Sequence, residues 1–159
     1  MTESETYHAY EGKRVVIVAS DEYMRQAIRS FVCLITDIDI DIYVDGEHAR
    51  EALTHDANDV YLLIVQTHLD VVNGLELVRA IRCGNTDAPR ELPVVVFGPE
   101  CGDPKLRDLA QRLDVNVYIE QPISYMSIMN ALLRAARTRI RLVPSSTYAL
   151  INTDIVDKL

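Results

Sequence analysis

Arg14-Val-Val-Ile-Val-Ala-Ser-Asp-Glu22 decides the fold, because a continuous apolar run ends there in a group of polar residues. A short apolar run without polar interruption is typical of a strand that is buried on both faces of a parallel sheet. From Met24 to Val32 the apolar residues then recur at three- and four-residue spacing, which is the pattern of an amphipathic helix. The stretch therefore predicts a buried strand followed by a helix that covers the sheet.

The same alternation of a short apolar run and a helical pattern continues along the chain. Further strands are predicted at 38–44, 60–65, 93–97 and 115–119. Helices are predicted at 47–54, at 74–82, after the start signal Asp103-Pro104, and after Ser124, which can cap a helix. Strands that alternate with helices pair in parallel through right-handed crossovers. Five such units predict an α/β domain, a doubly wound three-layer α/β/α sandwich.

The two ends of the chain depart from this pattern. Residues 1–12 show no periodicity, so we expect a flexible N-terminal segment ahead of a domain at 13–142. Residues 143–159 form a C-terminal extension that begins with the breaker Pro144-Ser-Ser-Thr147 and carries two short apolar patches. These patches allow three arrangements: the extension packs on the domain, packs on a neighbouring molecule, or begins a linker.

Charge and composition narrow the classes of function. The chain has 159 residues and a formal net charge of −8. An acidic chain repels phosphate backbones, which disfavours nucleic acid as a partner. No apolar run approaches the length of a membrane span, and the first residues lack the features of a secretory signal. We therefore expect a cytoplasmic protein without membrane contact.

The three cysteines match neither a disulfide framework nor a zinc pattern. Cys33 lies in an apolar helical stretch and is expected in the core, whereas Cys83 and Cys101 lie beside glycines and are expected at the surface. The sequence places no second ligand near His68, so no metal ion and no cofactor is expected.

Four spaced motifs resemble the receiver domains of two-component response regulators, over about residues 13–138. They are the opening stretch with its polar end, Val44-Asp-Gly-Glu-His-Ala49, Leu69-Asp-Val-Val-Asn-Gly-Leu-Glu-Leu77 and Tyr118-Ile-Glu-Gln-Pro122. The resemblance implies the flavodoxin-like receiver fold with strand order 2-1-3-4-5. It also implies a phosphoryl-accepting pocket at the carboxyl ends of the strands. In that family the pocket contains two acids that help hold Mg²⁺, an acceptor aspartate, a Ser or Thr, and a Lys.

Carried over one position at a time, the resemblance places this pocket at Ser20, Asp21, Gln66, Gly98 and Gln121. Gln66 stands at the acceptor position, and a carboxamide cannot form an acyl phosphate because it has no carboxylate oxygen to attack with. Gly98 lacks the hydroxyl group, and Gln121 lacks the ammonium group that would neutralise phosphate. Ser20 replaces the first acid, so Asp21 alone offers a carboxylate to Mg²⁺.

We therefore expect a degenerate pseudo-receiver that is not an enzyme and that acts in signal transduction by phosphorylation-independent protein–protein interaction or dimerisation. One alternative is the receiver portion of a transcriptional or other response regulator that is still phosphorylated at a non-standard site. Asp70 lies four residues beyond the acceptor position and is read as a solvated loop residue. A flavodoxin-like cofactor binder is disfavoured, because the loop Ala19-Ser-Asp-Glu-Tyr23 has two acids and no glycine.

The expected partner is a protein, which includes a second copy of this chain. The resemblance points to the face formed by the fourth helix, the fifth strand and the fifth helix, with Tyr118 as a contact residue. Arg134, Arg137 and Arg141 belong to the one basic cluster and are further candidates. Arginines near the end of a helix also stabilise the helix dipole, which is the simpler interpretation.

Overall fold

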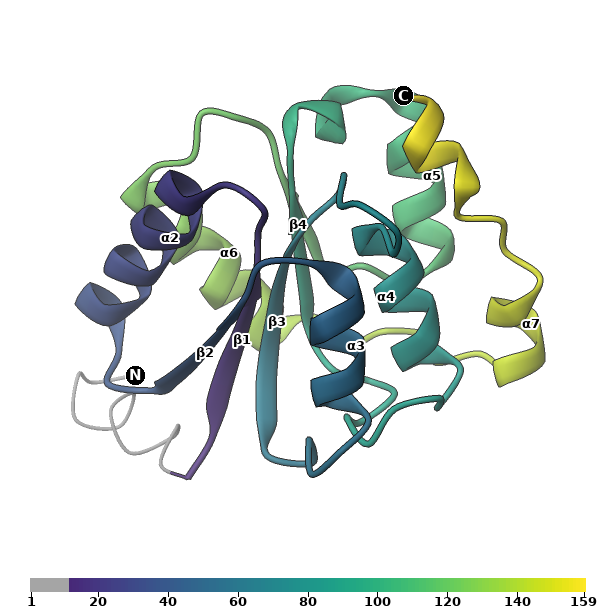
Figure 1. Ribbon diagram of the computed structural model, residues 1–159, viewed down its shortest axis with the longest axis horizontal. Helices are drawn as coiled ribbons and strands as arrows, with labels where there is room; N and C mark the ends of the chain where they lie inside the picture. The colour runs from purple at the N-terminus through teal and green to yellow at the C-terminus, as the bar shows by residue number, and fades with distance from the viewer. Residues whose placement is uncertain (1–11) are drawn as a thin grey trace.

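The computed structural model describes residues 12–159, so the flexible segment predicted at 1–12 lies, apart from Gly12, outside the described residues (Figure 1). Five parallel strands form one sheet in the order β2-β1-β3-β4-β5. The strands are β1 (Arg14–Val18), β2 (Asp39–Tyr43), β3 (Val60–Gln66), β4 (Val94–Phe97) and β5 (Val117–Ile119). The predicted α/β sandwich and its strand order 2-1-3-4-5 are confirmed.

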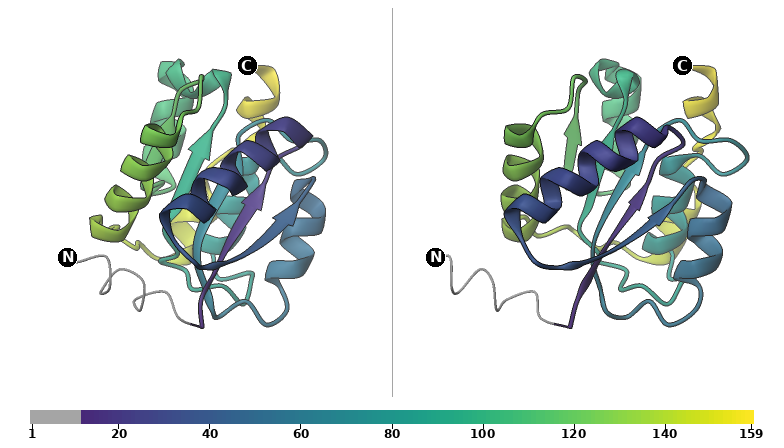
Figure 2. Two further views of the ribbon diagram at one scale, coloured as in Figure 1. Left: turned by 90° about the vertical axis from the view of Figure 1, so that its left-hand side faces the viewer. Right: turned by 60° about the vertical axis from the view of Figure 1, so that its left-hand side comes forward.

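Helices cover both faces of the sheet (Figure 2). On one face lie α2 (Glu22–Ile35) and α6 (Tyr125–Arg137), and on the other lie α3 (Gly46–Leu53), α4 (Gly74–Arg82) and α5 (Pro104–Arg112). Two short 3₁₀ helices, η1 (Pro99–Gly102) and η2 (Asp154–Lys158), and the short helix α7 (Ser145–Ala149) complete the described elements. In this numbering the fourth and fifth helices of the receiver pattern are α5 and α6.

Strand β1 shows why the opening apolar run forms a buried strand. Val15 and Ile17 pack in the cluster beneath α2 and α6, and Val16 and Val18 pack in the cluster on the opposite face. Alternate side chains of a strand point to opposite faces, so a strand covered on both sides has to be apolar at every position.

Each of the five main helices begins at a polar residue whose side chain accepts a hydrogen bond from a backbone N–H of the first turn. These N-caps are Asp21, Asp45, Asn73, Asp103 and Ser124. The predicted start signals at Asp103 and Ser124 are thus confirmed. Because each helix follows a strand, all five caps lie along the edge where the strands end, which is the upper edge in Figure 1.

The C-terminal extension packs on the domain. Tyr148, Ile151 and Val156 are buried in the cluster that α4 and α5 also line. The Tyr148 hydroxyl donates to Asp114 Oδ2 at 2.6 Å, and Asn73 Nδ2 donates to the Thr153 backbone oxygen at 3.1 Å. Residues 143–159 therefore run along α4 and end beside the loop that follows β3.

Arg82 is fully buried, and its hydrogen-bond partners are backbone oxygens. Its guanidinium donates to the carbonyl oxygens of four residues, Arg90, Leu92, Leu113 and Asp114. Burial lowers the pKa of Arg82 to about 10, which still leaves it protonated at neutral pH. The side chain therefore ties the end of α4 to the loop that precedes β4 and to the loop that precedes β5.

Two of the cysteine predictions are wrong. Cys33 is exposed, because it lies on the side of α2 that faces away from the sheet, and Cys101 is fully buried within η1. Burial raises the pKa of the Cys101 thiol to about 12. None of the helices formed by residues 12–159 has both the length and the apolar character required to span a bilayer.

Candidate functional site

The residues predicted for the degenerate pocket gather at the carboxyl edge of the sheet. Gln66 is the last residue of β3, one residue later than the predicted strand end, and it lies between the ends of β1 and β4. Its Oε1 atom accepts from the Ser20 backbone N–H at 2.9 Å and from Ser20 Oγ at 3.2 Å. The amide oxygen at the acceptor position is thus already satisfied by the loop that follows β1.

Asp21 supplies the one carboxylate among the five predicted pocket residues, and its side chain caps α2. The Asp21 Oδ1 atom accepts from the Met24 backbone N–H at 3.0 Å. In the same loop Arg25 Nη1 donates to the Ala19 and Ser20 backbone oxygens at 2.8 and 2.9 Å. Backbone oxygens that could otherwise face a cation are therefore held by a guanidinium group.

Gly98 lies where the resemblance expects a hydroxyl group, and a side chain there has no room. Its φ of +153° is a conformation that residues other than glycine rarely adopt. A Cβ atom would collide with Thr67 Oγ1 and would lie 2.8 Å from Glu100 Oε2. The Thr67 hydroxyl itself donates to Glu100 Oε2 at 2.8 Å. The Thr67 hydroxyl, in the loop after β3, and the Glu100 carboxylate, in η1, thus fill the space beside Gly98.

The oxygen ligands at this edge do not fit a Mg²⁺ ion, which is the ion that the receiver fold implies. The Asp21 carboxylate is used as a helix cap, the Glu100 carboxylate accepts from the Thr67 hydroxyl, and the Gln66 amide oxygen already accepts two hydrogen bonds. Within residues 12–159 no group of three or more His, Cys, Asp or Glu side chains is placed to hold a metal ion. Mg²⁺ prefers a nearly octahedral set of oxygens with carboxylates among them, so we derive no step through it.

Gln121 precedes Pro122 at the end of β5, and the peptide bond between them is cis. Its side chain is exposed. An exposed carboxamide at the lysine position adds no charge to the pocket, whatever its rotamer. The structure therefore brings Ser20 and Gln66 into contact and leaves Gln121 at the rim.

Tyr118 is half-buried and packs on the face of the sheet that α5 covers. The Arg107 guanidinium lies 5.3 Å from the centre of its ring, a cation–π contact. Arg107 also forms an ion pair with Glu120 at 2.5 Å and donates to the Cys101 backbone oxygen at 3.2 Å. The tyrosine thus lies under a guanidinium that is itself held by two further partners, Glu120 and the Cys101 backbone oxygen.

The arginine candidates do not form one cluster with Tyr118. Arg134 and Arg137 are exposed in the last turn of α6, which packs on the other face of the sheet. Arg141 pairs with Asp114, at 2.9 and 3.2 Å, and this carboxylate also accepts from Tyr148. Its role in the structure is to hold the start of the C-terminal extension.

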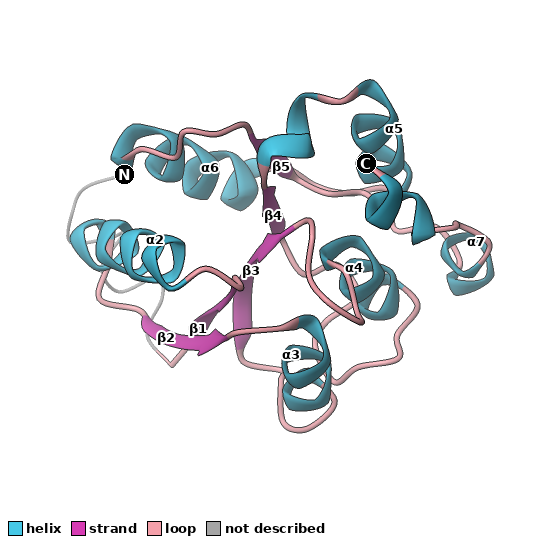
Figure 3. Ribbon diagram, turned by 45° about the horizontal axis from the view of Figure 1, so that its top comes forward, coloured by secondary structure: helices cyan, strands magenta, loops and turns pink. Residues whose placement is uncertain are grey.

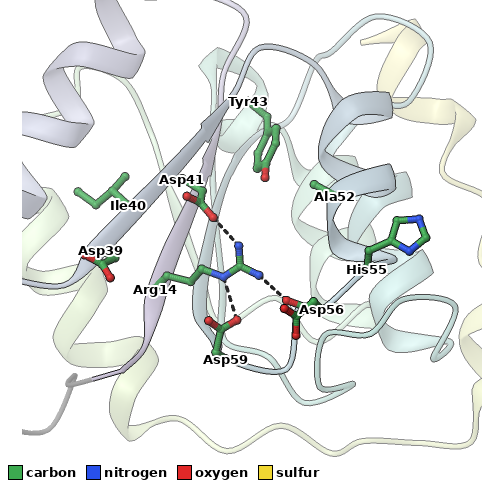
Figure 4. A pocket seen from close by; sticks show the side chains of 9 residues that line it. All are labelled: Arg14, Asp39, Ile40, Asp41, Tyr43, Ala52, His55, Asp56 and Asp59. Atoms are coloured by element: carbon green, nitrogen blue, oxygen red, sulfur yellow. Dashed lines mark hydrogen bonds and ion pairs between the residues drawn. The ribbon is translucent and has the colours of Figure 1, made fainter.

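A separate hollow of about 710 Å³ lies near the opposite edge of the sheet, where β1 and β2 begin (Figure 4). Arg14 stands at its centre and donates to Asp41 at 2.5 Å, to Asp59 at 2.9 Å and to the Asp56 backbone oxygen at 2.7 Å. The guanidinium and the two carboxylates are paired with one another. None of the side chains that line the hollow is a buried polar group without a hydrogen-bond partner.

Sequence reasoning missed Thr67, Glu100, Arg25 and Arg107, which decide the shape of the edge. A polar residue directly after a buried strand, as at Thr67, is a usable signal, because such a residue has to find a hydrogen-bond partner. Its pairing with Glu100 joins residues 33 positions apart and is not visible as a local pattern.

Comparison with known proteins supports the fold and leaves the family open. No family model matches the chain, and no curated protein matches it. Solved structures of receiver domains do match. The chemotaxis protein CheY4 of Vibrio cholerae is 16% identical with a TM-score of 0.67, over 77% of this chain and 98% of its own. A putative response regulator from Chloroflexus aurantiacus is 15% identical with a TM-score of 0.70, over 80% of this chain and 100% of its own.

A third match is the receiver domain of a sensor histidine kinase from Pseudomonas aeruginosa, whose structure has a magnesium ion coordinated in the active site cleft. It is 16% identical with a TM-score of 0.67, over 80% of this chain and 99% of its own. At these identities the matches establish that the chain has the receiver fold, and they carry no function across.

Proposed function

We propose that this chain is a receiver-type signalling module that works without phosphorylation, by binding a protein partner. The observation that carries the proposal is the filled acceptor pocket. Gln66 accepts two hydrogen bonds from Ser20, and the Thr67–Glu100 pair fills the space beside Gly98. No carboxylate nucleophile stands at the acceptor position, and no ammonium group stands at position 121 to balance phosphate charge.

A fixed surface around Tyr118 is the second part of the proposal. Because the protein's own side chains fill the pocket, no phosphoryl group binds there and pulls the loop after β4 toward itself. The contacts that Arg107 makes with Tyr118 and Glu120 favour one arrangement of this face. We therefore expect Tyr118 to act as a constant contact residue instead of a residue that alternates between two positions.

The test uses the full chain labelled with ¹⁵N. Amide spectra are recorded with Mg²⁺ and beryllofluoride, and intact mass is measured after incubation with acetyl phosphate and Mg²⁺. We expect unchanged amide shifts around Gln66 and no phosphoryl adduct on any residue, Asp70 included. A Mg²⁺-dependent adduct, or shifts centred on the strand ends, would contradict the proposal and support phosphorylation at a non-standard site.

The partner is sought in parallel. Light scattering over a concentration series shows whether the chain pairs with itself, and capture from the source cell with the wild type and Tyr118→Ala shows whether this face recruits another protein. Binding that is equal with and without acetyl phosphate supports the proposed mode of action.

A further inference from the structure

Large apolar side chains are exposed along the carboxyl edge of the sheet, which Figure 3 tips toward the reader. Tyr23 and Met126 are the second residues of α2 and α6, and Val44 and Val71 lie in the loops after β2 and β3. Their exposed fractions are 79% for Tyr23, 56% for Met126, 51% for Val44 and 85% for Val71. These are four of the nine large apolar side chains that are exposed within residues 12–159. Exposed apolar side chains that gather in one region of a protein are candidates for contact with another molecule.

Val71 is held outward by the backbone around it. Its φ is +66°, a conformation that a β-branched residue rarely adopts, and the Val72 N–H donates across it to the Asp70 oxygen at 2.8 Å. Leu69 and Val72, which flank the Asp70-Val71 pair, are buried. The fold thus keeps Leu69 and Val72 in the core, and the strained residue between them projects its apolar side chain into solvent.

The same edge is strongly acidic. From each strand end to the second residue of the following helix, all five connections carry at least one Asp or Glu. Lys105 is the one lysine or arginine in these five segments. Arg25, which lies further along α2, donates hydrogen bonds to the Ala19 and Ser20 backbone oxygens. Carboxylates therefore share these segments with the four apolar side chains, although Glu120 is already paired with Arg107 and Asp45 with His48.

We propose that the surface formed by Tyr23, Val44, Val71 and Met126, here called the apolar rim, is the docking surface for a basic amphipathic segment of a partner protein. The inference rests on the proposed function and names the face and the chemistry of the partner. Apolar side chains of the segment cover the rim, and its lysines or arginines meet the carboxylates. The negative potential of this edge excludes nucleic acid and disfavours the same edge of a second copy.

The experiment uses the ¹⁵N-labelled full chain and three synthetic peptides of equal length. The probe peptide is an amphipathic helix of Leu and Lys, and its two controls replace Lys by Glu or Leu by Ser. We expect the probe to shift amides in the connections that carry Tyr23, Val44, Val71 and Met126, with weaker binding as salt rises. The Glu peptide should not bind, and the Ser peptide should bind at least about tenfold more weakly.

Val71→Gly separates binding from folding. Glycine adopts positive φ without strain, so the variant should melt no lower than the wild type, whereas the loss of the side chain should lower the affinity for the probe about tenfold. Leu150→Ser is the matched control, because Leu150 is also 85% exposed but lies on the C-terminal extension beside α7. It should leave the affinity for the probe unchanged.

Three outcomes would overturn this inference. The first is an equal response to the Lys and Glu peptides, and the second is a response centred on Tyr118 and α5. The third is concentration-dependent shifts at the apolar rim without peptide, which would assign the surface to a second copy. In the second and third cases the chain still binds protein without phosphorylation, so the proposed function survives. A Mg²⁺-dependent phosphoryl adduct would remove the proposed function while leaving the peptide result to stand.

Discussion

The Thr67 hydroxyl occupies the space that a side chain at Gly98 would need. It is held there by Glu100, whose Oε2 atom accepts a hydrogen bond from it at 2.8 Å. The two positions lie on neighbouring strand ends, because the Thr67 N–H donates to the Phe97 oxygen at 3.0 Å. The pair formed by Thr67, in the loop after β3, and Glu100, in η1, thus occupies the space beside Gly98, and this can be tested by substitution.

Gly98→Ala should destabilise the fold by about 1–3 kcal/mol, because alanine rarely adopts φ +153° and its Cβ meets Thr67 Oγ1. The free energy of unfolding by urea, followed by circular dichroism, measures the loss. Removing the hydroxyl in Thr67→Ala should make the same glycine substitution less costly, so a double-mutant cycle should show coupling.

Gly102→Ala is the control for that series. A Cβ at Gly102 would lie 3.5 Å from Glu120 Oε1, an ordinary contact, and its φ is not in the positive range. A change well below that of Gly98→Ala is expected. Equal losses at the two glycines would contradict the steric account.

Gln66→Asp alone should not create a phosphoacceptor. The introduced carboxylate would stand beside Ser20 and the Thr67–Glu100 pair, with no ammonium at position 121 and no hydroxyl at position 98. Intact mass after incubation with acetyl phosphate and Mg²⁺ should show no added phosphoryl group.

The triple variant Ser20→Asp, Gln66→Asp and Gln121→Lys restores three of the missing groups and serves as the comparison. We expect a measurable, Mg²⁺-dependent adduct from it, because two more carboxylates and an ammonium group return. If the single variant were labelled as readily as the triple variant, the missing cation and acid would not explain the lack of phosphorylation that we propose.

Tyr148→Phe should lower the free energy of unfolding by about 1–3 kcal/mol at neutral pH, since it removes a buried hydrogen bond to the Asp114 carboxylate. Burial and then this hydrogen bond raise the pKa of Tyr148 above its ordinary value near 10. The stabilisation is therefore fully present below pH 10 and is lost as pH rises through the raised pKa.

The gap in stability between wild type and Tyr148→Phe should consequently narrow above pH 10. Denaturant midpoints at several alkaline pH values measure it. Cys101, whose pKa is raised to about 12, ionises in both proteins, so its effect largely cancels in the difference. A gap that widened with pH would show that the phenol does not carry the titration.

Asp45→Asn should lower the pKa of His48. The hydrogen bond and the charge of Asp45 raise the pKa of His48, whose Nδ1 lies 2.7 Å from Asp45 Oδ2. Asparagine still caps α3, so the variant removes the charge and keeps the helix start. An NMR titration of the imidazole protons measures the change.

Glu47→Gln is the matched control, because Glu47 is a minor cause of the same shift. The sign of the linkage follows from the direction of the shift. Any stabilisation from protonated His48 is present below about pH 6.5 and is lost as pH rises through its raised pKa. An unchanged His48 pKa in Asp45→Asn would contradict the assigned ion pair.

The fold was predictable because its signals are local. The apolar run that begins at Arg14, the start signals at Asp103 and Ser124, and the turn after β2 each report on a few neighbouring residues. The positions of the pocket residues followed from the same landmarks, which is why Ser20 and Gln66 were placed at one edge and are in contact in the structure.

The contents of the pocket could not be predicted in the same way. Thr67 and Glu100 meet only after the sheet has formed, and each has several polar partners available in sequence terms. The fate of the C-terminal extension was open for a similar reason. The apolar character of Tyr148 and Ile151 is compatible with packing on the domain, on a neighbouring molecule or in a linker. Their burial against α4 depends on a groove that exists only in the folded domain.

The C-terminal extension is synthesised after the surface of the domain that it covers. Arg82, Asp114 and every strand precede Tyr148, so a ribosome releases α4 and its apolar flank before the residues that cover them. Until then the nascent chain exposes a groove that the finished protein hides.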